Sequence, residues 1–175
     1  YIEKYKKDPV FDVAAAETQM RLGDIKFDAK QYGASADEYK LVVADYSDLP
    51  KFNPFKSRAL LQAGMSYFSE AEAKGFAEAP LRKAAEQYDQ LLTRYEKNFD
   101  KGKSEFEGRA EYITSGIINL GLTYSKLNET DKAVATYAMM PKSNPEYGRA
   151  VFFRGQAFVD AGRTDEAVKI YRDMV

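Results

Sequence analysis

Residues 114–147 read TSGIINLGLTYSKLNETDKAVATYAMMPKSNPEY, and residues 148–175 repeat the landmarks of this stretch 34 positions later. The matched pairs are Gly121 and Gly155, Tyr124 and Phe158, Thr130 and Thr164, Asp131 and Asp165, Ala133 and Ala167, and Tyr137 and Tyr171. A period of this length is typical of two-helix units, which stack because one unit alone cannot bury its apolar face. The sequence therefore predicts an all-α array with an extended binding surface.

Two earlier copies keep the same landmarks with less regular spacing. One has Gly64 on its first helix and Ala84 with Tyr88 on its second, but its two halves are eight residues further apart than in the reference copy. We expect these residues to form an insertion near Ala71 to Pro80. The predicted units of a single array are residues 1–13 (a half unit), 14–49, 57–98, 114–147 and 148–175 (truncated), and we expect the array to be an excerpt of a longer chain.

Helix starts are indicated by capping residues. Asp8-Pro9, Asn53-Pro54 and Asn144-Pro145 each place a capping side chain before a proline suited to the first helical turn. Ser104 to Glu107 form a capping box, which predicts a helix from about Ser104 to Leu127. Thr130 and Thr164 are expected to cap the second helices of the last two units. No alternating run predicts a strand.

Composition excludes several classes of function. The 175 residues carry 26 Lys and Arg against 27 Asp and Glu, so the chain lacks the positive field of a nucleic-acid-binding protein. It contains no Cys and no His, which removes thiolate metal sites, disulfides and the usual proton shuttles. A mean hydropathy of −0.54 and the absence of long apolar runs argue against a membrane span. We therefore expect no metal, no cofactor and no nucleic acid.

Three local motifs have alternative interpretations. Gly102-Lys103-Ser104 resembles the end of a phosphate-binding loop, but Lys97 stands where the upstream glycine is required, and a solvated link is favoured. Asn128-Glu129-Thr130 is a formal glycosylation sequon that coincides with a turn of the repeat. The carboxylates Glu70, Glu72 and Glu78 could serve acid–base chemistry or a cation, although solvated helix surface is the favoured interpretation.

The pattern in residues 114–147 resembles the tetratricopeptide repeat. Its landmarks here are Ile117, Leu120-Gly121 and Tyr124 on the first helix, Ala133 and Tyr137 on the second, and Pro145 at the close. The resemblance implies a right-handed superhelical solenoid of antiparallel helix pairs that works as a non-catalytic protein-interaction scaffold. In this family the inner groove is lined by four positions of each first helix. Carried over to this chain, the groove set comprises Met20, Phe27, Arg58, Leu61, Met65, Phe68, Ile118, Leu122, Arg149, Phe152, Gln156 and Val159, together with the polar Glu17, Asp24, Ser115 and Ser125.

The Lys and Asn pattern by which some family members hold a terminal carboxylate is absent from this set. The remaining strip is largely apolar, which suits an amphipathic helix or an apolar extended peptide of a partner protein, with Arg58 and Arg149 available for acidic flanks. In the alternative interpretation, neighbouring repeats or the insertion cover part of the strip.

Ala44-Asp45-Tyr46-Ser47 and Thr93-Arg94-Tyr95-Glu96 are similar to the ends of second helices in bacterial envelope repeat proteins of the BamD and YbgF type. This similarity implies a subunit of a multi-protein complex in the periplasm or at the outer membrane, with the cytoplasm as the alternative. A second functional hypothesis is a regulatory or substrate-presenting arm of an enzyme whose catalytic domain lies outside residues 1–175. A third is end-to-end self-assembly.

Overall fold

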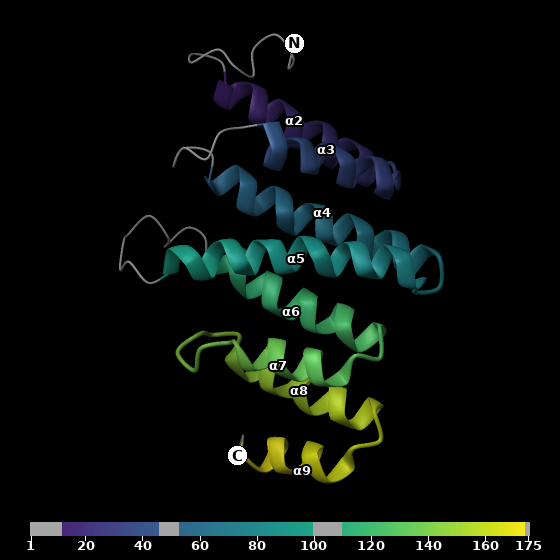
Figure 1. Cartoon of the computed structure of the whole chain (residues 1–175), viewed down its shortest axis with the longest axis vertical. Coiled ribbons are helices and arrows are strands. Elements are labelled where there is room, and N and C mark those ends of the chain that lie inside the picture. The colour runs from purple at the N-terminus through teal and green to yellow at the C-terminus, as the bar shows by residue number, and fades with distance from the viewer. Residues whose placement is uncertain (1–11, 46–52, 100–109, 174–175) are drawn as a thin grey trace.

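The structure, a computed structural model, describes residues 12–45, 53–99 and 110–173. Within these ranges it contains eight helices and no strand (Figure 1). The helices are α2 (Asp12–Asp28), α3 (Tyr32–Asp45), α4 (Asn53–Ala73), α5 (Glu78–Phe99), α6 (Ala110–Lys126), α7 (Thr130–Ala138), α8 (Tyr147–Asp160) and α9 (Thr164–Arg172). The predicted all-α helical repeat architecture is confirmed.

The helices form four hairpin pairs that follow one another along the long axis of the molecule (Figure 1). Each helix packs on the next one in the chain. In addition, the first helices of successive pairs touch one another, α2 on α4, α4 on α6 and α6 on α8. The first helices therefore line one continuous face of the array. The groove residues predicted from the sequence belong to these helices.

The two helices of each pair approach closely at a glycine. A Cβ atom at Gly121 would lie 2.8 Å from Cδ1 of Tyr137 and closer still to two other ring carbons, so only glycine fits under this ring. The same contact between a first-helix glycine and a second-helix tyrosine recurs in every pair: Gly23 with Tyr39, Gly64 with Tyr88, Gly121 with Tyr137, and Gly155 with Tyr171. One packing contact thus explains why glycine and tyrosine recur 34 residues apart in the last two pairs.

The turn inside each pair contains a residue in the left-handed region. Lys30, Asn128 and Gly162 have φ values of 58°, 58° and 73°, and their turns close with the two backbone hydrogen bonds of a Schellman motif. In the second pair both Gly75 and Phe76 are left-handed, at 67° and 61°. Asn128, the sequon residue, therefore occupies a position that the turn itself requires.

The eight additional residues of the second pair do not form a separate loop. Helix α4 continues nine residues beyond Gly64, whereas α6 ends five residues beyond Gly121. Helix α5 begins six residues before Ala84, whereas α7 begins three residues before Ala133. The extra sequence near Ala71 to Pro80 therefore lengthens both helices by about one turn, which makes the second pair the longest of the four.

The predicted caps at Thr130 and Thr164 are wrong. Each threonine is the first residue of its helix, and the preceding residues, Glu129 and Arg163, take the N-cap position without a side-chain hydrogen bond. The tight Schellman turn explains the difference, because it already fixes the backbone that leads into α7 and α9. The caps expected at Asp8 and Ser104 lie outside the described residues.

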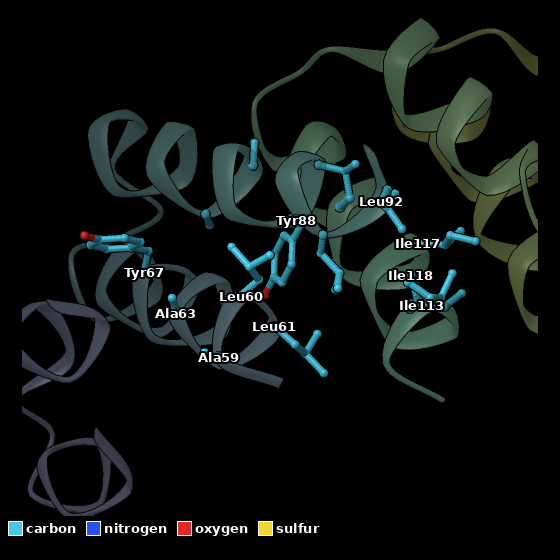
Figure 2. Packing of buried hydrophobic residues seen from close by; sticks show 14 of the residues in the cluster. Ala59, Leu60, Leu61, Ala63, Tyr67, Tyr88, Leu92, Ile113, Ile117 and Ile118 are labelled. Atoms are coloured by element: carbon cyan, nitrogen blue, oxygen red, sulfur yellow. The ribbon is translucent and has the colours of Figure 1, made fainter. Parts of the chain in front are cut away.

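The core runs between the pairs without interruption. Figure 2 shows the ring of Tyr88 between α5 and α4, next to Leu60, with Ile113, Ile117 and Ile118 on the neighbouring helix α6. Tyr39, Tyr67, Tyr88 and Tyr137 are all buried, as expected for packing tyrosines. Stacked pairs thus share one apolar core, as a repeat array must.

Polar contacts on the surface also join each pair to the next. They connect residues on different pairs and are partly or fully exposed. The contacts are Arg58 Nη2 to Asp24 Oδ2 at 3.2 Å, Tyr124 Oη to Asp89 Oδ2 at 2.8 Å, and Arg163 Nη1 to Asp131 Oδ1 at 2.5 Å.

Candidate functional site

A groove of about 510 Å³ crosses the face formed by the first helices; we call it the large groove. Its walls come from α4, from α6 and from the segment that leads into α8. The lining residues are Leu61 and Met65 of α4, then Glu111, Thr114, Ser115, Ile118 and Asn119 of α6, and Asn144, Pro145, Glu146 and Arg149. Three successive helix pairs therefore contribute to one depression.

A second cavity of about 130 Å³, the small pocket, adjoins the large groove. Its lining residues are Met65, Phe68 and Ser69 of α4, Tyr88 of α5, and Asn119 and Leu122 of α6. Met65 and Asn119 line both cavities, so the small pocket continues the large groove along α4 and α6. Together they form an apolar floor with a few polar groups at defined places.

The polar groups of the large groove are fixed by hydrogen bonds. Asn144 donates from Nδ2 to Oγ1 of Thr114 at 2.9 Å, while its Oδ1 accepts from the backbone N–H of Glu146 at 2.8 Å. Asn144 thereby ties the entry of α8 to α6, because one side chain satisfies groups on both elements.

The floor of the small pocket is held in a similar way. The phenol of Tyr88 is hydrogen-bonded to the side chain of Asn119, and burial raises the pKa of Tyr88 well above its ordinary value of 10.0. The phenol therefore stays neutral at physiological pH and contributes a rigid wall rather than a charge.

Charge around the site differs from the sequence-based expectation. Arg149 pairs with Glu146 at 3.2 Å and Arg58 pairs with Asp24 at 3.2 Å, so both arginines expected to meet acidic flanks already have carboxylate partners. Among the described residues Glu111, at the mouth of the large groove, has no such partner. The lining of the large groove thus holds two carboxylates against one guanidinium.

The structure brings together six of the twelve predicted groove residues in these two cavities. These six are Leu61, Met65, Phe68, Ile118, Leu122 and Arg149. Met65 is the most accessible apolar member, at 36% exposure, whereas Leu61 and Ile118 contribute mainly to the core beneath. Their role in binding a partner stays a prediction.

The other six lie elsewhere. Met20 is 2% exposed and belongs to the core, and the ring of Phe27 packs edge-on against Tyr32 at 5.3 Å between ring centroids. Arg58 serves the contact to Asp24 described above. On α8, Phe152 and Val159 are 49% and 47% exposed, and Gln156 is bonded to Asp160. None of these six lines the large groove or the small pocket.

Sequence reasoning placed Ser115 in the groove set, and Ser115 does line the large groove, but it missed other polar residues of the site. Asn119 and Glu111 lie outside the groove positions that the family resemblance supplies, and no local signal marks them. Asn before Pro predicted a helix start at Asn144, but α8 begins at Tyr147 with Glu146 at the N-cap position. The link from Asn144 to Thr114 follows only from the packing of α8 on α6.

No cluster of three or more metal-ligating side chains occurs within residues 12–45, 53–99 and 110–173. In the same ranges no helix is both long and apolar enough to span a membrane. The carboxylates near the α4–α5 turn include two that are engaged by cations one turn away, Glu70 with Lys74 at 2.5 Å and Glu78 with Arg82 at 3.0 Å. The motif at Gly102 to Ser104 falls outside the described residues.

Comparison with known proteins agrees with the geometry. Residues 118–175, which contain α7, α8, α9 and most of α6, match the tetratricopeptide repeat family. No curated protein matches the chain. Repeats of this kind are modules for protein–protein interaction. We conclude that residues 118–175 carry tetratricopeptide repeats, and that the two helix pairs before them repeat the same glycine–tyrosine contact.

Proposed function

We propose that this protein is a non-catalytic scaffold that binds a segment of a partner protein in the large groove and the small pocket. The observation that carries the proposal is the continuity of the two cavities across α4, α6 and α8. A groove of about 510 Å³ is as large as the pockets of about 300–1,000 Å³ in which proteins bind small molecules, and so has room for a few side chains of a partner.

The chemistry of the walls supports the same proposal. Apolar side chains such as Met65 and Ile118 form the floor, while the amides of Asn119 and Asn144 stand at the edges. An apolar floor gives affinity through buried area, and a few oriented amides select the backbone or side chain that fits. This arrangement recognises a polypeptide segment better than a highly charged ligand.

A selection experiment tests the proposal. A phage-displayed library of random peptides is selected on the protein, and the enriched peptides are synthesised and measured by fluorescence anisotropy. We expect Met65→Glu to weaken binding at least about tenfold, because it places a charge where the peptide buries apolar surface. Leu41→Glu is the matched control, since Leu41 is a similarly exposed apolar residue on α3 that lines neither cavity.

Peptides that bind Met65→Glu and Leu41→Glu as tightly as the unaltered protein would contradict the proposed site. Circular dichroism at 222 nm confirms that each variant keeps its helices. A place in a bacterial envelope complex and a role as the arm of an enzyme stay predictions from the sequence.

A further inference from the structure

We infer that the partner segment anchors one phenylalanine-sized apolar ring in the small pocket and places a basic residue, about four positions away when the segment is extended, opposite Glu111. This inference rests on the proposed function and specifies the chemistry of the partner. Three observations carry it: the size of the small pocket, the way its wall is built, and the charge at the mouth of the large groove.

The small pocket has the size of one aromatic ring. Its volume is about 130 Å³, and an apolar cavity of about 150 Å³ in a protein is known to take up benzene. Phe68, Leu122, Met65 and the ring of Tyr88 supply apolar walls. Ser69 and Asn119 are its polar neighbours, so most of the lining is apolar.

The wall at Phe68 is supported by a strained residue. The ring of Phe76 packs edge-on against Phe68, with 6.1 Å between centroids and 65° between ring planes. Lys126 Nζ lies 4.4 Å from the centre of the Phe76 ring. Phe76 adopts a φ of 61°, a conformation that is costly for a bulky residue. The lengthened α4–α5 hairpin thus holds Phe76 against Phe68, which lines the small pocket, and such strain is concentrated at ligand sites.

The carboxylate of Glu111 at the large groove determines which kind of residue should flank the ring in the partner segment. Glu111 has no ion-pair partner among the described residues, whereas Glu146 and Arg149 form an ion pair with each other. Asn119, at the small pocket, and Glu111 are about 12 Å apart along α6, a distance that an extended segment crosses in about four residues of 3.3–3.6 Å each. A basic side chain at that position would face Glu111.

The test uses methyl NMR on the full chain with ¹³C-labelled methionine. The probe is a short Gly/Ser peptide carrying one phenylalanine and, four positions later, one arginine. We expect a saturable shift of the Met65 methyl signal, because Met65 lines both cavities, while Met139, exposed and outside both, serves as internal reference. Replacing the peptide phenylalanine by alanine should weaken binding at least about tenfold. Replacing its arginine by glutamate should weaken it up to about fivefold, and this effect should vanish in Glu111→Gln.

Two matched variants locate the ring. Ser69→Phe places an intramolecular ring in the small pocket, whereas Ala73→Phe adds the same ring on the exposed end of α4, outside both cavities. We expect the Met65 shift to disappear only in Ser69→Phe. Equal shifts with the phenylalanine and alanine peptides, no shift, or an unchanged shift in Ser69→Phe would overturn the anchor. If these tests failed but library-selected peptides still lost affinity in Met65→Glu, the phenylalanine anchor would be wrong and the groove would remain the proposed binding site. Failure of the anchor can therefore be distinguished from failure of the proposed function.

Discussion

Gly121→Ala should destabilise the protein even though alanine is the better helix former. In an exposed helix this change would stabilise by about 1 kcal/mol. Here the new methyl group would lie 2.8 Å from Cδ1 of Tyr137 and closer to two more ring carbons, well inside the 3.5–4.0 Å optimum for carbon atoms. Tyr137 is 2% exposed and has little room to retreat. Overpacking of this kind costs about 1–3 kcal/mol, and taking the upper end gives a net loss of about 2 kcal/mol.

Urea unfolding followed by circular dichroism measures this change. Two controls isolate the contact. Gly33→Ala, where the added methyl would meet only the Glu70 carboxylate, with Oε2 at 3.6 Å and Cδ at 3.9 Å, should leave stability equal or higher. Tyr137→Leu lowers stability by itself, but in that background Gly121→Ala should become neutral or favourable, because the ring that it strikes is gone. If Gly121→Ala raised the unfolding midpoint in the unaltered background, the close-approach explanation would be refuted.

Three further outcomes are expected. Burial raises the pKa of Tyr88 and Tyr137 above 10.0, so above pH 10 the folded state keeps protons that the unfolded chain loses. The free energy of unfolding should therefore be constant below pH 10 with respect to these two groups and fall above it. An alkaline titration that follows tyrosinate absorbance together with circular dichroism measures this. Lys30→Gly should raise stability by about 0.5–1 kcal/mol in thermal melts, because it relieves a left-handed residue, and a lower melting temperature would contradict this. Thr130→Ala should change the urea midpoint by less than about 0.5 kcal/mol, whereas loss of a true cap would cost about 1 kcal/mol.

The fold could be predicted because one contact repeats. Glycine under a tyrosine ring leaves a signature that survives irregular spacing, so Gly64 and Tyr88 were paired correctly despite the eight extra residues between their helices. The conformation of those residues could not be predicted, since a helical extension and a loop have similar composition when both face solvent. The same limit applies to Thr130, because its role depends on a turn whose geometry is fixed by backbone hydrogen bonds.

The candidate site was predictable only in part. Met65, Phe68 and Leu122 follow from the family positions and line the cavities. Phe76 could not be assigned to the site from the sequence, because its contact with Phe68 depends on a left-handed turn in a hairpin longer than the reference copy. The pairing of Arg149 with Glu146 likewise depends on how the chain enters α8.

The polar contacts between helix pairs respond to salt differently from the contacts within a pair. Within a pair, the tyrosine ring packs directly on the glycine, so the two helices are held close together by a contact that salt does not screen. Between pairs, contacts such as Arg163 with Asp131 lie where dissolved ions screen them. The large groove crosses two of these joints, one between α4 and α6 and one between α6 and α8. Dissolved salt therefore weakens these exposed contacts, while the apolar core that the pairs share keeps successive pairs packed together.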